Sequence, residues 1–214
     1  MADTTNSGFL VLADISGYTA FVTKTELEHG PPIIAALLEA VIERIAPPLD
    51  VLQIEGDAVF ALGVDGTVMP PVALLEVLRA GFAGFRARQA ELAADESCNC
   101  GACARVSALR LKIIGHHGAF LEQTIGGRPQ AVGSDVILAH RLLKNGVSRD
   151  DHYALLTRPA LDSMGVDPNG AGLSERIERY EHFGDIPCFV MGGLTPESPC
   201  AETVGSHDAR VGLA

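Results

Sequence analysis

The chain has 214 residues, of which 47% are hydrophobic, so it is long enough to bury the core of one domain. Its 16 basic and 27 acidic residues give a formal net charge of -11, and no Lys/Arg cluster marks a nucleic-acid surface. The N-terminus lacks the order of a signal peptide and charged residues interrupt the most apolar helical stretch, which predicts a cytoplasmic protein that binds neither nucleic acid nor membrane.

The first predicted strand, residues 8 to 14, is aliphatic and uncharged until it ends at Asp14. An uncharged run of this kind is typical of a strand buried on both faces. After it, Ser16 and Gly17 can start a helix, and the free N–H groups at a helix start bind phosphate readily. Because Asp14 would repel a phosphate, we expect a cation between them. The pattern therefore predicts a metal site that needs a second acid.

That second acid is expected in the next elements. A helical region from about 17 to 46, interrupted at "HGPP", precedes a hairpin with strands at 49 to 54 and 58 to 63. Asp57 lies in the hairpin turn, and two acids on neighbouring strand ends can share a hard divalent cation. From spacing alone, the alternative stays open that Asp14 caps the following helix and Asp57 only forms the turn.

A long amphipathic helix is predicted over residues 70 to 94, and a cysteine-rich loop, "CNCGAC", follows it. An odd number of cysteines without a secretion signal favours thiols or a metal site over a disulfide framework. A soft metal such as zinc could be bound there if a fourth ligand joined the three thiols of Cys98, Cys100 and Cys103. Free or redox-active loop thiols are the alternative.

The second half of the chain mixes strands and helices without strict βαβ alternation. We expect a strand in "ALRLKIIGHHG", a hairpin at "GGRP", and a helix from about Ser134 to a stop at Gly146. A strand and a helix in "HYALLTRPALDSMG" and a last strand in "IPCFVMG" complete the set. The fold class predicted is α+β, with helices packed on a mixed or antiparallel sheet. One domain is expected over residues 1–193, with a disordered tail over 194–214.

Several motifs, taken in order, resemble the class III adenylyl and guanylyl cyclase catalytic domain. "LVLADISGYTAFV" is similar to the first metal motif of that family, "IEGDAVFAL" to its second, and "LRLKIIGHHG" to its strand ending in a His-x-Gly turn. "AVGSDVILAHRL" resembles the helix with the transition-state residues, and "YEHFGDIPCFVMGG" the closing segment. The matches run in order over residues 8 to 192.

The resemblance implies a ferredoxin-like βαββαβ fold, a role in signal transduction, and a head-to-tail homodimer with composite sites at its interface. The chain is most similar to a bacterial branch with a Cys-rich insertion, about 95–106 here, which is not expected to build the nucleotide site. Carried over by position, Arg141 is the catalytic residue, and a two-metal site for Mg or Mn comprises Asp14, Asp57 and the Ile15 backbone. Nucleotide contacts are implied at Ser16, Gly17, Tyr18, Thr19, Gln53 and Gln130. Outside this motif order, Arg141 would be an exposed arginine paired with Asp135, and His116 is expected to serve packing.

Three positions depart from the family pattern. Ile137 stands where the family has asparagine, and glutamines replace the purine-reading lysine and acid at Gln53 and Gln130. Isoleucine cannot hydrogen-bond the ribose, and loss of a positioned contact lowers rates by orders of magnitude. The sequence thus predicts binding of ATP or GTP with weak or lost cyclase (phosphorus–oxygen lyase) activity. The alternative is a non-catalytic dimeric module for nucleotide sensing or protein interaction.

Overall fold

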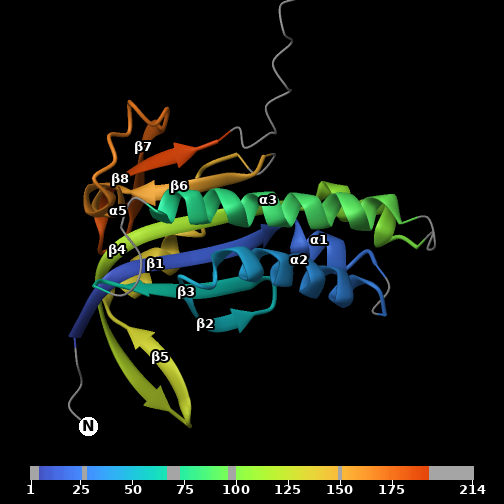
Figure 1. The fold of residues 1–214 in the computed structure, drawn as a ribbon, viewed down its shortest axis with the longest axis horizontal. Coiled ribbons are helices and arrows are strands. Elements are labelled where there is room, and N and C mark those ends of the chain that lie inside the picture. The colour runs from blue at the N-terminus through green and yellow to red at the C-terminus, as the bar shows by residue number, and fades with distance from the viewer. Residues whose placement is uncertain (1–4, 26–27, 67–72, 96–99, 149–150, 193–214) are drawn as a thin grey trace, which may run out of the picture.

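The computed structural model describes residues 5–25, 28–66, 73–95, 100–148 and 151–192. It contains an eight-stranded sheet with helices packed on it (Figure 1). The strands are β1 (Thr5–Ser16), β2 (Asp50–Glu55), β3 (Ala58–Val64), β4 (Arg110–Ile125), β5 (Arg128–Val132), β6 (Tyr153–Thr157), β7 (Ser174–Tyr180) and β8 (Gly184–Met191). The helices are α1 (Tyr18–Val22), α2 (Gly30–Ile45), α3 (Ala73–Ala94), the 3₁₀ helix η1 (Cys103–Ala108), α4 (Ser134–Leu142) and α5 (Arg158–Met164).

The sheet is mixed, as predicted. Its strand order is β2-β3-β1-β4-β6-β8-β7, and β5 pairs with β4 off this path. Strands β4 and β6 run parallel, whereas the other pairs are antiparallel. The last part of β4 and all of β5 form an arm that projects from the body of the protein (Figure 1). The predicted α+β fold class is therefore confirmed.

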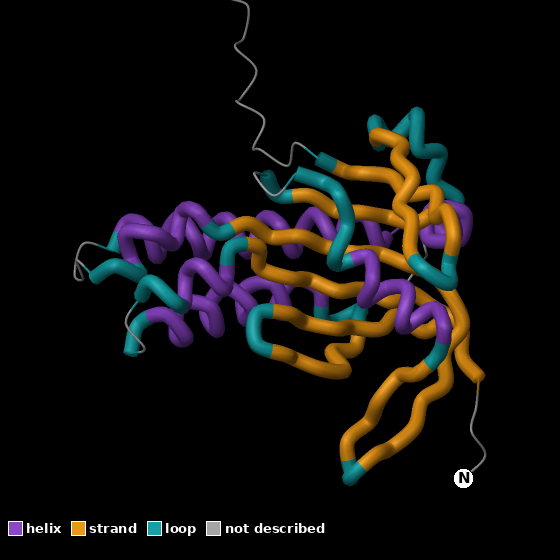
Figure 2. Tube along the Cα trace, turned by 180° about the vertical axis from the view of Figure 1, so that it is seen from behind, coloured by secondary structure: helices purple, strands orange, loops and turns teal. Residues whose placement is uncertain are grey.

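Both faces of the central strand β1 are buried, as its uncharged run predicted. Alternate residues from Phe9 to Ile15 join the core cluster that includes α2, α3 and α5. Leu10 and Leu12 point the other way and join a second cluster with α4. Figure 2 shows helix and sheet from behind, with a short helix lying across this face. Because side chains alternate along a strand, Asp14 and Ser16 at the end of β1 lie on the same face as Leu10 and Leu12, which is the α4 face of the sheet.

Among the described residues, no helix is long and apolar enough to cross a membrane.

Two elements differ from the sequence prediction. Helix α4 ends at Leu142 rather than at Gly146, because the Asn145 side chain donates to the Leu142 carbonyl (2.7 Å) and caps the helix early. The Gly146 N–H instead donates to Glu178. Strand β7, "SERIERY", was not predicted, because it pairs only with β8 at the edge of the sheet and carries mostly exposed side chains. An edge strand of this kind lacks the apolar run that marks a buried strand.

His152 is a half-buried neutral base, which gives the stability a testable pH dependence. Its Nδ1 accepts the Leu111 N–H (3.0 Å), and its ring packs edge-on against Phe82 and Phe85. Burial, with a smaller effect of nearby arginines, lowers the pKa of His152 from 6.5 to about 4. A lowered histidine pKa gives stability that is complete above the unfolded value and lost as pH falls through it.

We expect the free energy of unfolding to fall by about 2 kcal/mol between pH 7.5 and pH 5 through His152 alone. Urea denaturation of the wild type and of His152→Gln at both pH values measures this difference. The glutamine oxygen can still accept the Leu111 N–H, so the variant should fold and lose part of the pH dependence. The same pH dependence in both proteins would contradict the assignment.

Candidate functional site

Asp14 and Asp57, the two acids predicted from the sequence, lie at the end of β1 on the α4 face. Asp14 continues the alternation of Leu10 and Leu12 along the strand, and its register partner on β3 is Ala58. Asp57 precedes Ala58 in the β2–β3 turn, and its backbone carbonyl accepts the Ile15 N–H (3.1 Å). This hydrogen bond ties the turn to the end of β1, so the two carboxylates line one pocket.

That pocket has a volume of about 560 Å³ and is open to solvent. The segment that follows Asp14 lines it, including the backbone position and the loop residues that the sequence predicted, Ile15, Ser16, Gly17, Tyr18 and Thr19. Gly17 has φ 92°, a conformation that favours glycine, and starts α1. Helix α1 has only five residues, so the predicted phosphate-binding helix is little more than one turn. An anion bound here would therefore be held by the loop's own N–H groups rather than by a helix dipole.

Lys112 is a functional candidate that the sequence reasoning missed. It is the register partner of Asp14 on β4, and its Nζ lies 2.8 Å from Asp14 Oδ2. The same ammonium donates to the Leu143 carbonyl (2.9 Å) just after α4, and the side chain is only 10% exposed. A charged residue inside the apolar run "LRLKIIG" was the available signal, since such a charge needs a partner. Lys112 thus places a fixed positive charge in the pocket.

The electrostatics of the pocket favour binding of a further cation. Burial, followed by the negative charge of Asp14, raises the pKa of Asp57, although Lys112 and a backbone hydrogen bond act in the opposite direction. The ionised pair is thus incompletely neutralised. Two carboxylates and a backbone carbonyl are oxygen ligands of the kind that Mg²⁺ prefers, and Mg²⁺ commonly completes its shell with water and phosphate. Among the described residues, no group of three or more His, Cys, Asp or Glu side chains is placed to hold a metal.

A second pocket of about 220 Å³ adjoins the first and shares Asp14, Asp57 and Leu143 with it. Gln53 and His140 line this second pocket. The remaining predicted nucleotide contact, Gln130, lies on the β5 arm, and the predicted catalytic residue, Arg141, lies on the exposed face of α4. Neither Gln130 nor Arg141 is among the described residues that line the two pockets.

A partly buried hydrogen-bond network fixes the start of α4. The Ala119 N–H donates to Asp135 Oδ2 (2.8 Å), and His116 bridges Asp135 Oδ1 (3.4 Å) and the Thr157 hydroxyl (2.8 Å). His116 is 3% exposed and therefore serves packing and hydrogen bonding, as expected. Gly118 lies against this network, because a Cβ there would come within 2.4 Å of the Asp135 carboxyl carbon. Asp135 thus holds α4 on the sheet, and no ion pair links it to Arg141 in the described structure.

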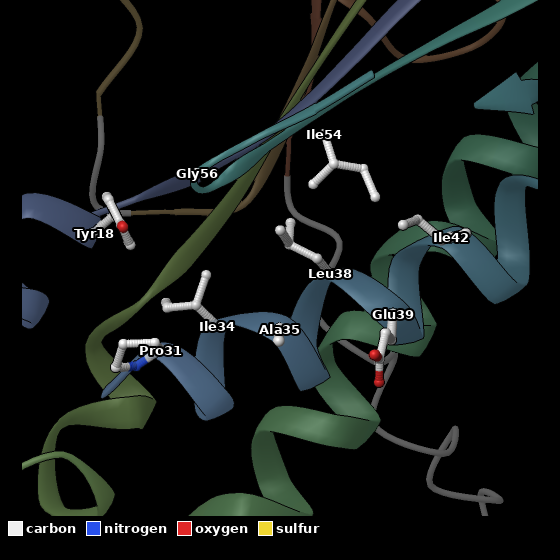
Figure 3. Close-up of a pocket in the computed structure, with 9 residues that line it drawn as sticks. All are labelled: Tyr18, Pro31, Ile34, Ala35, Leu38, Glu39, Ile42, Ile54 and Gly56. Carbon is white, nitrogen blue, oxygen red and sulfur yellow. The ribbon is translucent and has the colours of Figure 1, made fainter. Parts of the chain in front are cut away.

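An apolar groove of about 220 Å³ lies on the other side of Tyr18, between α2 and the β2–β3 hairpin. Figure 3 shows Leu38 and Ile42 of α2 facing Ile54 of β2, whereas the Glu39 carboxylate points away from Ile54. Ile54 is 57% exposed, which is unusual for a large aliphatic side chain. Tyr18 lines both this groove and the larger pocket that contains Asp14 and Asp57, the acidic pocket, so the two hollows are neighbours.

The cysteine-rich loop lies outside the pocket of Asp14 and Asp57 among the described residues. Cys98 lies outside the described residues, whereas the Sγ atoms of Cys100 and Cys103 are 3.5 Å apart. Cys103 starts η1, and Leu109, the residue after η1, lies beside Gly17, since a Cβ added to Gly17 would lie 3.7 Å from Leu109 Cδ2. The insertion does not line the acidic pocket among the described residues, and its Arg105 shares a small hollow with Gly17, Ala108 and Leu109.

The chain matches the profile of a known protein family. The profile of the family described as "Protein of unknown function (DUF2652)" matches residues 34–153, more than half of the chain. The chain belongs to this family. Uncharacterized protein Rv2561/Rv2562 of Mycobacterium tuberculosis is 34% identical to this DUF2652 chain over 120 residues, which are 53% of the chain and 52% of the relative. The chain thus spans about half the length of the curated relative that it matches.

Solved structures of cyclases share the fold of this DUF2652 chain. The adenylyl cyclase CyaB from P. aeruginosa matches with a TM-score of 0.69 at 13% identity, over 89% of this chain and 96% of that one. The guanylyl cyclase Cya2 matches with a TM-score of 0.71 at 12% identity, over 93% and 98%. The catalytic core of a rhodopsin-guanylyl cyclase in complex with ATPαS matches with a TM-score of 0.60 at 12% identity, over 88% and 97%. The chain therefore has the fold of a class III cyclase catalytic domain.

Proposed function

We propose that this DUF2652 chain binds a nucleoside triphosphate, ATP or GTP, together with Mg²⁺ or Mn²⁺ in the acidic pocket. One observation carries the proposal: Asp14, Asp57 and the Gly17 turn line a single pocket large enough for a triphosphate, beside the fixed charge of Lys112. The shared fold and the ATPαS complex of one structural neighbour support the ligand class. Binding at this site would serve a signalling role.

Each part of the pocket has a role in this proposal. Asp14, Asp57 and the Ile15 carbonyl would hold the divalent cation, which supplies neutralisation of phosphate oxygens when bound. The N–H groups of residues 16–19 would orient the phosphates. Lys112 and Lys144, which also line the pocket, add positive charge that attracts the triphosphate despite the two acids.

The proposed site is completed by a second copy of the chain. Ile137 and Arg141 are four residues apart on α4 and share its exposed face, away from the pockets of their own chain. A head-to-tail homodimer would bring Arg141 of one copy to the phosphates bound by the other. The exposure of Ile54 (57%) and Ile137 (53%) fits surfaces that a partner covers.

Cyclisation is proposed to be weak or lost. It requires the ribose 3′-oxygen in line with the α-phosphorus, and Ile137 offers the ribose no hydrogen bond. Gln53 and Gln130 can still hydrogen-bond a purine, because an amide both donates and accepts. This retention of binding groups with loss of an orienting group favours a second candidate function, a nucleotide-sensing module without turnover.

The test of the proposed function is calorimetry of the full chain with ATP and GTP, with and without Mn²⁺, followed by an assay for cyclic product. We expect metal-dependent binding of at least one nucleotide, little or no cyclic product, and a dimer by analytical ultracentrifugation at micromolar concentration. The absence of metal-dependent binding to both nucleotides would overturn the proposal. Rapid formation of cyclic product would instead overturn the loss of catalysis.

Arg141→Ala is expected to weaken nucleotide binding by about 10-fold or more, since a hydrogen bond to a charged group contributes about 1.5–3 kcal/mol. Arg141 is exposed, so thermal stability should not change. Arg79→Ala is the matched control, because Arg79 is also exposed but pairs with Glu76 on α3, far along the chain from the pocket residues. Equal affinities of the two variants, measured by calorimetry, would remove Arg141 from the composite site.

A further inference from the structure

Cys100 and Cys103 form a thiol pair that the proposed nucleotide site does not use. Their Sγ atoms lie 3.5 Å apart, and both side chains are half-buried at the edge of the main core cluster. The Ala104 N–H donates to the Cys100 carbonyl (3.3 Å), so the chain makes one helical turn there. Residues three apart in such a turn lie on the same side. The backbone therefore holds the two thiols together.

The surroundings of the pair favour reaction between the two sulfurs. The Cys103 N–H donates to Cys100 Sγ (3.4 Å), a contact that stabilises negative charge on that sulfur. A thiolate is the attacking species in thiol–disulfide exchange. A disulfide requires an S–S distance of about 2.05 Å, so the two sulfurs need to approach by about 1.5 Å within the same turn. Partial exposure leaves room for a small reagent.

Coordination of a soft metal is less well supported by the described residues. Two histidines that are candidates for a further ligand have other partners: His116 contacts Thr157 and Asp135, and His117 contacts Asp65. Cys98 lies outside the described residues. Cys188 is fully buried in the second core cluster, on the α4 side of the sheet. No group of three or more His, Cys, Asp or Glu in the described part of the chain is placed to hold a metal.

We propose that Cys100 and Cys103 are a thiol–disulfide exchange site whose co-substrate is a low-molecular-weight disulfide. The Cys100 thiolate attacks one sulfur of the small disulfide, the S–S bond of that molecule breaks, and the first small thiol leaves. Cys103 then loses its proton and attacks the Cys100 sulfur, so the mixed disulfide breaks and the second small thiol leaves. The protein pair loses two electrons and two protons, and the small disulfide becomes two thiols.

The site lies on the segment that supports the Gly17 loop. Cys103 is the first residue of η1, and Ala108 at the other end of η1 lies with Leu109 and Gly17 around one small hollow. Gln89 of α3 holds this segment through hydrogen bonds to the Val106 and Leu109 carbonyls (both 2.8 Å). The exchange reaction itself needs no nucleotide, so it stands or fails independently of the proposed function.

The experiment uses the full chain with Cys98→Ser and Cys200→Ser, which leaves the pair and the buried Cys188. The protein is equilibrated in buffers of reduced and oxidised glutathione, quenched with acid, alkylated and mapped by mass spectrometry. We expect a Cys100–Cys103 disulfide that forms within one chain, reverts fully on reduction, and leaves Cys188 as a thiol. Burial raises the pKa of the Cys188 thiol to about 12, so it is an internal control.

A third substitution separates the two chemical steps. In Cys103→Ser the resolving thiol is missing, so we expect one glutathione to remain attached to Cys100 as a mixed disulfide. Circular dichroism checks that each variant is folded. The disulfides of the wild-type chain are mapped by the same mass spectrometry, so the test does not depend on the folding of any variant. The proposal is overturned if the pair stays reduced at every glutathione ratio, if only disulfides between chains form, or if the purified wild type carries stoichiometric zinc that depends on Cys100.

Discussion

Asp57→Asn is expected to make the metal-free protein more stable and at the same time to abolish metal-dependent nucleotide binding. Burial and the Asp14 charge raise the pKa of Asp57, which means that its ionised form is disfavoured in the fold at neutral pH. Asparagine removes that charge, and its backbone carbonyl still accepts the Ile15 N–H. We expect the melting temperature to rise by about 1–2 °C, because Asp57 is only partly buried and solvent screens its charge; about 1 kcal/mol would correspond to about 2–4 °C in a domain of this size.

The same substitution is expected to weaken binding of the proposed ligand. Removing one of two carboxylates from a proposed metal site should weaken binding of ATP or GTP with Mn²⁺ by about 100-fold or more. Calorimetry measures the affinity, and the shift in melting temperature on adding Mn²⁺ and nucleotide gives an independent readout. If Asp57→Asn is more stable and still binds nucleotide with Mn²⁺ as the wild type does, Asp57 is not a ligand of the metal.

Asp14→Asn is the matched control, because it removes the other carboxylate but has the opposite effect on stability. Asp14 is the partner of Lys112, whose side chain is only 10% exposed. Without this partner the buried ammonium loses its neutralising charge, and we expect a loss of about 2 kcal/mol in the free energy of unfolding. Both variants should lose metal-dependent binding, so the pair separates the stability effect from the ligand effect. If both variants change stability in the same direction, the charge balance described for the pocket is wrong.

Local patterns in the sequence predicted most of the fold. The uncharged run before Asp14 indicated a strand buried on both faces, and the two prolines after "HG" indicated the start of α2, which begins at Gly30. These signals succeed because a residue's own neighbours determine them. Strand β7 was missed because its main interaction is with β8, and its exposed charged residues hide the alternation.

The candidate site could be predicted only in part for the same reason. A strand end and a turn were enough to single out Asp14 and Asp57, but Lys112 is recognised only when the register of β4 against β1 is known. The support that Leu109 gives to Gly17 depends on packing between residues far apart in the chain. Arg141 is exposed and lines neither pocket of its own chain, so its predicted role depends on the proposed second copy.

Ile137→Asn is expected to raise cyclase turnover from a very low level. Orientation of reacting groups accounts for as much as about 7–11 kcal/mol of a barrier in the best intramolecular cases, and the loss of one positioned donor costs about 10²–10³-fold in rate. Ile137 is 53% exposed on α4, so an asparagine there should not disturb the core, and its helix propensity is close to that of isoleucine. A rise of about 100-fold is therefore expected if ribose orientation is the missing contribution.

The measurement is cyclic product formed per protein with ATP and GTP in the presence of Mn²⁺, together with nucleotide affinity by calorimetry. An orienting asparagine should change the rate much more than the affinity, because the contact matters chiefly as the 3′-oxygen approaches the phosphorus. Ile137→Ala is the control, since it removes the isoleucine without adding a hydrogen-bonding group. If alanine raises turnover as much as asparagine does, steric obstruction by Ile137 is the cause. If neither variant gains activity, the glutamines at positions 53 and 130 limit the reaction by leaving the purine, and with it the ribose, without a fixed position.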